Sequence, residues 1–214
     1  MAATIIGNYN MKNLNQTFER YKLGDRVLGC RFSTVSTALL LLDNSKANNF
    51  VETGTTRRFS SDPQEMVGDG GMTRFFGEYV KIYGGHIWTC DIEPSHIENC
   101  KLATEEYKQN ITYVVDDSLS FLKSFDKEVD FLYLDSLDGD QPGAHDHQLK
   151  EVENIYHRLT DNTIVLLDDL GSKTNLSMPF LMKKGWIRLA FENLPQTHNM
   201  AQGLMIHKNR LCGS

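Results

Sequence analysis

The sequence predicts an α/β domain whose core is a doubly wound, mostly parallel sheet of seven strands. The first observation behind this prediction is that short β-branched apolar runs alternate with amphipathic stretches after about residue 46. A second observation is that the runs at 131–134 and 164–167 are continuously apolar, which suits strands covered on both faces. A third is a trailing pair of strand-like segments, which predicts a C-terminal antiparallel hairpin strand. We therefore expect a helical lead-in at 1–46 and one domain at 47–214.

The expected strands and helices follow from periodicity and from the residues that end each segment. Apolar side chains from Phe75 to Tyr83 recur at spacings of three and four, which predicts a helix over 72–83. A similar stripe from Leu149 to Leu159 predicts a second helix. A short apolar helix is expected at 36–42, and a last helix at 179–184 ends before Gly185. The expected strands are 49–52, 86–91, 111–115, 129–135, 163–168, 186–192 and 203–208.

Composition excludes some classes of protein. The formal net charge of −6 and the pI of about 5.6 disfavour a nucleic-acid partner, because such proteins usually present a basic face. The four cysteines (30, 90, 100 and 212) form no C-x-x-C pair, so reduced thiols are expected. The most apolar run, 38–42, is too short to cross a bilayer, and the first residues do not resemble a leader. We therefore expect a cytoplasmic protein without a membrane partner.

Each of the first five predicted strands ends at or beside a carboxylate. In an open parallel sheet, ligands bind outside the carboxyl ends of the strands, so these acids are expected to line one rim. Like charges so close together require a cation, a polyhydroxyl ligand or bound protons. The acids are Glu52, Asp91, Asp116 with Asp117, Asp135, and Asp168 with Asp169.

Three segments resemble the motifs of class I S-adenosylmethionine-dependent methyltransferases, a Rossmann-like family. They are 51–55 (an acid followed by a glycine turn), 88–91 and 130–135, and the resemblance extends over about 49–208. It implies S-adenosylmethionine as the cofactor, and it implies roles for particular positions. Glu52, Thr53, Gly54 and Thr55 would face the methionine end, Asp91 the ribose, and Asp117 and Ser118 the adenine. Ile92 and Asp135 would also help to hold the cofactor.

The sequence departs from the family pattern after the glycine turn. Residues 55–67 intervene before a glycine cluster at 68–71, which suggests a lid or a substrate loop. The G-x-G-x-x-G turn of nicotinamide dehydrogenases is absent.

The acids of the fourth and fifth strands suggest a metal. Asp135, Asp168 and Asp169 would converge, and three carboxylates suit a hard divalent ion such as Mg²⁺. The 166–169 end also resembles that of Mg²⁺-dependent O-methyltransferases of macrolide sugars, although the lysine that related enzymes often carry after the fourth-strand acid is missing. His145 or His147 is the expected general base, and Asp135 is a further expected catalytic residue. The alternatives are that the aspartates only cap a loop or hold the cofactor, and that the histidines are structural.

Methyl transfer to a hydroxyl of a small molecule is therefore the expected function. The Asp/Asn-Pro-Pro-aromatic sequence of nucleic-acid amino-methyltransferases and a Pro-Cys pair are both absent. Two alternatives stay open, namely a non-catalytic cofactor-binding module in an assembly and a metal-dependent hydrolase. The sequence also leaves homo-oligomer formation open.

Overall fold

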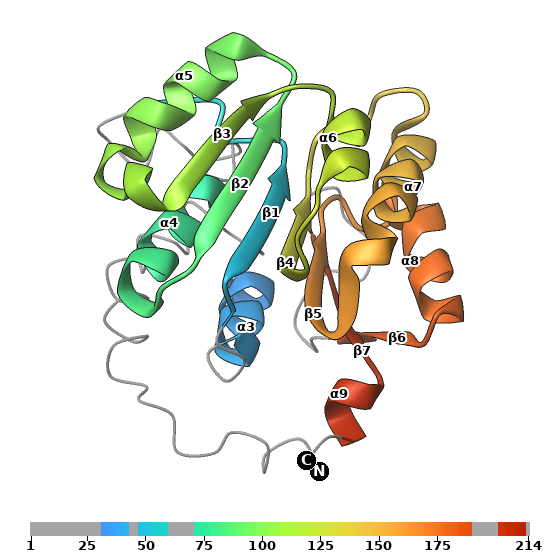
Figure 1. Cartoon of the computed structure of the whole chain (residues 1–214). Helices are drawn as coiled ribbons and strands as arrows, with labels where there is room; N and C mark the ends of the chain where they lie inside the picture. Colours follow the sequence, from blue (N-terminus) through green and yellow to red (C-terminus); the bar gives the residue numbers. More distant parts are fainter. Residues whose placement is uncertain (1–30, 43–46, 60–70, 190–200, 213–214) are drawn as a thin grey trace.

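A computed structural model describes residues 31–42, 47–59, 71–189 and 201–212, and within them seven strands form one sheet (Figure 1). The strands are β1 (Asn49–Thr53), β2 (His86–Asp91), β3 (Ile111–Val115), β4 (Val129–Leu134), β5 (Leu159–Leu167), β6 (Trp186–Leu189) and β7 (Gly203–His207). Their order across the sheet is β3-β2-β1-β4-β5-β7-β6. The first five are mutually parallel, and β7 lies antiparallel to both β5 and β6. The predicted doubly wound sheet with an antiparallel C-terminal strand is confirmed.

Helices cover both faces of this sheet (Figure 1). Helices α3, α4 and α5 pack on one face, and α6, α7 and α8 pack on the other. They lie there because, after each parallel strand, the chain must cross a face of the sheet to reach the end at which the next strand starts, and the crossing segment is a helix. The elements are α3 (Phe32–Leu42), α4 (Met72–Tyr83), α5 (Pro94–Ala103), η4 (Glu105–Asn110), α6 (Ser118–Ser124), α7 (Ala144–Ile155), η5 (Tyr156–Arg158), α8 (Thr174–Lys183) and α9 (Asn209–Cys212).

The two-residue repeat of the strands divides the core into two layers. Phe50 and Phe131 face α4, where the ring centroid of Phe76 lies 4.9 Å from that of Phe131. Val51 and Leu132 point to the opposite face and pack with α6, α7 and α8. Because each fully buried apolar side chain contributes about 1.5–3 kcal/mol, the two layers fix the sheet firmly between its helices. Side chains at the strand ends are positioned by this packing.

Sequence and structure differ at a few boundaries. The helix predicted to reach Leu159 ends at Ile155, because a single 3-10 turn intervenes and Leu159 already begins β5. Helix α8 begins at Thr174, five residues before the predicted start, and holds Pro179 inside it. Of the predicted lead-in, residues 1–30 and 43–46 lie outside the described residues. Within the described part of the chain, no helix is long and apolar enough to cross a membrane.

Candidate functional site

The carboxyl ends of β1, β2 and β4 meet at the turn that follows β1. The Gly54 amide donates a hydrogen bond to the Cys90 carbonyl (2.9 Å), and the Asp135 amide donates to the Thr53 carbonyl (2.9 Å). Gly54 has a φ of 76°, and a Cβ on it would lie 2.1 Å from the Asp135 carbonyl oxygen. Only glycine fits this position, both because of its backbone angle and because of the approach of β4. The structure thus accounts for glycine at this position by the approach of the chain that follows β4.

A buried network of hydroxyl groups on the α4 face stabilises this turn. Thr73 donates to Glu52 Oε2 (2.7 Å), and Thr89 donates to the hydroxyl of Thr55 (3.0 Å), which lies 3.3 Å from that of Thr73. Glu52 is 1% exposed, and burial raises its pKa to about 8. Glu52 therefore carries a proton at neutral pH. The structure places Glu52 and Thr55 beneath the turn, and Thr53 is also fully buried.

Asp91 ends β2 with its carboxylate at the rim. Oδ1 accepts hydrogen bonds from the Glu93 amide (2.9 Å) and lies 3.1 Å from Nδ1 of His96. Oδ2 accepts from the Thr55 amide at 3.3 Å. These contacts hold the carboxylate in one orientation beside the Gly54 turn. Asp91 is thus a preorganised acceptor of hydrogen bonds, as a ribose-binding acid needs to be.

Two exposed apolar side chains lie next to this acid. Ile92 is 65% exposed and Val115, which pairs with Asp91 in the sheet, is 51% exposed. Large exposed apolar residues at neighbouring strand ends suit a flat ligand that covers them. Asp117 follows β3 and caps α6, since its Oδ2 accepts from the Ser120 amide at 3.0 Å.

The two predicted histidines lie in different surroundings. Nε2 of His147 lies 3.0 Å from the Ser118 hydroxyl and 3.8 Å from Oε1 of Glu151, which also accepts from Ser136 (2.8 Å). Glu151 is 1% exposed, and burial raises its pKa. The His145 side chain is 49% exposed, and its Nε2 lies 3.5 Å from Asp146. The structure therefore brings His147 to the predicted adenine residue Ser118 and leaves His145 at the surface.

The three predicted metal ligands do converge, but a lysine lies among them. One carboxylate oxygen from each of Asp135, Asp168 and Asp169 lies within 4.8 Å of the others. Nζ of Lys173 lies 2.7 Å from Asp135 Oδ1 and 3.1 Å from Asp169 Oδ2, and its side chain is 2% exposed. Asp169 has a φ of 54°, a left-handed turn that aspartate tolerates better than most residues. That turn lets the chain after β5 bring Lys173 back to the acids.

An arginine pairs with the third carboxylate. Arg31 Nε donates to Asp168 Oδ1 (3.0 Å) and Nη2 donates to Oδ2 (2.6 Å). Tyr133 donates to Asp135 Oδ2 at 3.0 Å, so both oxygens of Asp135 and of Asp168 have donors. Although burial opposes it, the cations of Lys173 and Arg31 hold the pKa of Asp135 below its ordinary value. Burial and the charge of Asp135 raise the pKa of Asp168 to about 7.

Sequence reasoning missed both cations. Lys173 lies four positions after Asp169 at the start of a helix, and this spacing is a usable signal. Arg31 carries no such signal, because 137 positions separate it from Asp168.

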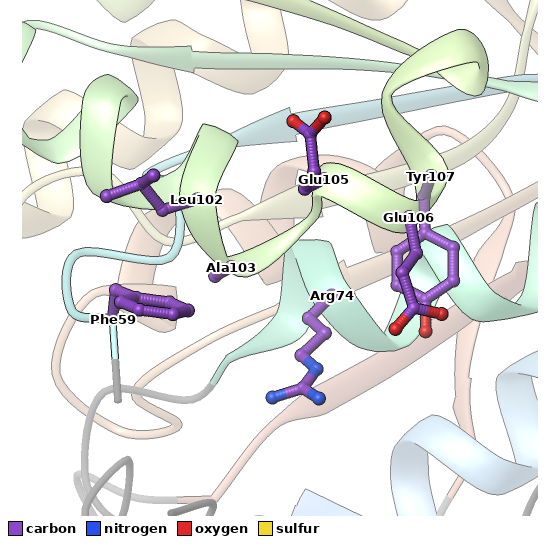
Figure 2. A pocket seen from close by; sticks show the side chains of 7 residues that line it. All are labelled: Phe59, Arg74, Leu102, Ala103, Glu105, Glu106 and Tyr107. Carbon is purple, nitrogen blue, oxygen red and sulfur yellow. The ribbon is translucent and has the colours of Figure 1, made fainter. Parts of the chain in front are cut away.

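A cavity of about 180 Å³ lies away from this rim. It opens between the chain after β1, the first turn of α4, and the connection from α5 to η4 (Figure 2). In Figure 2 the apolar side chains of Phe59 and Leu102 lie on one side of it and the guanidinium of Arg74 and the carboxylate of Glu106 on the other. None of the predicted site residues lines it.

Comparison with known proteins gives one matching family model. A family model described as a methyltransferase domain matches residues 66–170, which include Asp91, Ser118 and Asp135 and end just after Asp169. No curated protein matches the sequence.

Solved structures of low sequence identity share the fold. An SAH-bound methyltransferase of Podospora anserina has a TM-score of 0.59 at 14% identity, covering 95% of this chain and 89% of that one. An O-methyltransferase from Bacillus cereus in complex with SAH has a TM-score of 0.55 at 13% identity, with 94% and 92% covered. An rRNA methylase from Streptococcus thermophilus has a TM-score of 0.53 at 12% identity, with 80% and 93% covered. The fold is thus common to enzymes with different acceptors.

Proposed function

We propose that this chain, whose residues 66–170 match a methyltransferase-domain model, transfers the methyl group of S-adenosylmethionine to a hydroxyl of a small molecule. The observation that supports this proposal most directly is the set of strand ends around Gly54. There an oriented carboxylate, Asp91, lies beside the exposed apolar side chains of Ile92 and Val115. An acceptor of hydroxyl hydrogen bonds next to an apolar surface is the chemistry that an adenosine moiety requires.

The residues present fit the cofactor. Asp91 would accept hydrogen bonds from the ribose, while Ile92 and the Ser118 end of α6 would flank the adenine. The Gly54 turn, which lies between Asp91 and Asp135, would face the methionine end. When bound, S-adenosylmethionine supplies an electrophilic methyl group on a sulfonium. The chain's contribution is then to orient the cofactor and the acceptor in line.

Asp135 is the acid best placed to meet the acceptor. Its side chain is 28% exposed, whereas those of Asp168 and Asp169 are 1% and 12% exposed. The lowered pKa keeps Asp135 ionised, so it can accept a hydrogen bond from a substrate hydroxyl and orient that oxygen toward the methyl group. The exposed carboxylate supports a hydroxylated acceptor and O-methylation.

The two alternatives fit the geometry less well. A metal-dependent hydrolase needs carboxylates that are available to a metal, but Arg31 and Lys173 already pair with the three acids. A non-catalytic cofactor-binding module gives the partly exposed Asp135 no role. It is distinguished by turnover, since such a module would bind cofactor and form no methylated product.

Calorimetric titration with S-adenosylhomocysteine tests the cofactor part of the proposal. We expect micromolar binding to the unmodified protein, and Asp91→Ala should weaken it by about 1–3 kcal/mol through the loss of hydrogen bonds to an ionised acceptor. Asp126→Ala is the matched control, because this exposed acid precedes β4 at the opposite edge of the sheet. Equal affinity in all three proteins, or no binding at all, would contradict the proposal. A turnover screen of hydroxylated acceptors then tests the acceptor class, with release of S-adenosylhomocysteine as the measured signal.

A further inference from the structure

Lys173 holds a buried position that few lysines hold. Its side chain is 2% exposed, although Lys173 is the residue immediately before α8. Lysine is rarely buried to this degree unless its charge is paired. Here the ammonium contacts the two carboxylates that follow β4 and β5, Asp135 and Asp169. The buried ammonium is therefore paired with two carboxylates and not isolated.

The ammonium lies where the acids would otherwise require a metal. A divalent ion would have to bridge Asp135 and Asp169, and Nζ already lies 2.7 Å and 3.1 Å from their oxygens. Asp168, the third acid, is paired with Arg31 through both of its oxygens. Arg31 and Lys173 are thus two fixed cations among the three acids. A divalent ion would add a like charge beside a buried ammonium, which is unfavourable in a poorly solvated site.

We infer that Lys173 supplies, as a fixed ammonium, the positive charge that a divalent metal would supply to these three acids, so that the protein functions without Mg²⁺. Lys173 is a positioning residue, because it acts through Asp135 and is itself closed off from the acceptor. Its contact of 2.7 Å with Oδ1 holds the Asp135 carboxylate in one orientation. The part that concerns methyl transfer rests on the proposed function, whereas the part that concerns metal binding stands alone.

The test is Mn²⁺ binding, which is measured as the loss of the free-ion signal in electron paramagnetic resonance. We expect the unmodified protein to bind no Mn²⁺ at this site up to millimolar concentration. Lys173→Ala vacates the space among the carboxylates, and we expect it to bind Mn²⁺ at least tenfold more tightly. Lys173→Arg keeps the cation and should behave like the unmodified protein. Addition of Asp169→Asn to Lys173→Ala should abolish the gained binding.

Two results would overturn the inference. One is micromolar Mn²⁺ binding by the unmodified protein that Asp169→Asn removes, since the acids would then hold a metal beside Lys173. The other is a folded Lys173→Ala protein with no gain in Mn²⁺ affinity, since the ammonium would then not stand in a metal's place. Lys173→Met serves as a second neutral variant if the alanine protein does not fold. Binding of S-adenosylhomocysteine in EDTA is measured in parallel, and its failure would count against the proposed function alone.

Discussion

Arg31 forms a two-point ion pair with Asp168 across 137 positions of the chain, with both contacts at 3.0 Å or less. The pair joins the start of α3 to the carboxyl end of β5, on the face of the sheet that also carries Tyr133 and Asp135. Thr34, in the same helix, donates to Gln202 (2.7 Å), and Gln202 donates to the Tyr133 hydroxyl (3.3 Å). Helix α3 is therefore part of the structure that supports the candidate site.

Arg31→Met should destabilise the protein by about 3–5 kcal/mol, because it leaves the 1% exposed Asp168 buried without its partner. The loss should be larger at pH 8 than at pH 6. Without Arg31 the buried Asp168 carboxyl must stay protonated in the folded protein, and the free-energy cost of keeping that proton rises with pH. Urea unfolding at the two pH values measures this. Arg57→Met is the control, because its pair with Asp138 is exposed and contributes at most about 1 kcal/mol. Equal losses in the two variants would contradict the prediction.

Stability should fall as the pH rises from about 5 to 8, because of Glu52. The pKa of Glu52 is raised from 4.5 to about 8, so within this window the folded protein keeps a proton that the unfolded chain has released. The slope is at most about 1.4 kcal/mol per pH unit for one such group. Glu52→Gln mimics the protonated acid and should make the dependence less steep, as measured by urea unfolding; the raised pKa values of Asp168 and Glu151 account for the remaining slope. Glu98→Gln, at an exposed position, should leave the slope unchanged.

Glycine-to-alanine substitutions at two positions with similar backbone angles should differ sharply. Gly54 and Gly143 have φ values of 76° and 80°, so each alanine brings about 1–2 kcal/mol of backbone strain. At Gly143 nothing lies within 4 Å of the added Cβ, whereas at Gly54 the Asp135 carbonyl oxygen lies 2.1 Å away. We expect Gly54→Ala to lose at least about 1 kcal/mol more in thermal or urea unfolding. Equal losses would show that the approach of β4 relaxes at little cost.

His147→Ala should weaken binding of S-adenosylhomocysteine by about 0.5–1.5 kcal/mol, because it removes the hydrogen-bond partner of Ser118. His145→Ala should change neither binding nor turnover, since His145 is half exposed beside Asp146. Calorimetry measures the effect of His147→Ala on cofactor binding, and steady-state kinetics measures its effect on catalysis. A fall in kcat of a hundredfold or more in His147→Ala, with unchanged cofactor affinity, would instead make His147 the general base.

Local pattern was sufficient to predict most of the fold. Strands β2 and β3 and helix α4 have the predicted bounds, because alternation and three-to-four spacing are properties of neighbouring residues. The rim of carboxylates was predictable as well, since parallel strands present their carboxyl ends at one edge. The errors arose where tertiary contacts override local preference. Helix α8 begins at Thr174, so Pro179 lies in its interior rather than in its first turn, and the end of an apolar stripe belongs to a 3-10 turn and to β5.

The chemical state of the site was decided by the tertiary structure alone. The sequence by itself determined which acids meet, because strand order and strand ends follow from periodic pattern and crossover rules. It did not determine their charge, because burial makes Glu52 a neutral acid and the nearby cations keep Asp135 ionised. Nor did it determine their partners, because Arg31 and Lys173 reach the cluster from α3 and from the chain after β5. Electrostatic interactions depend on distance in space and on exclusion of water, and neither quantity exists until the chain has folded.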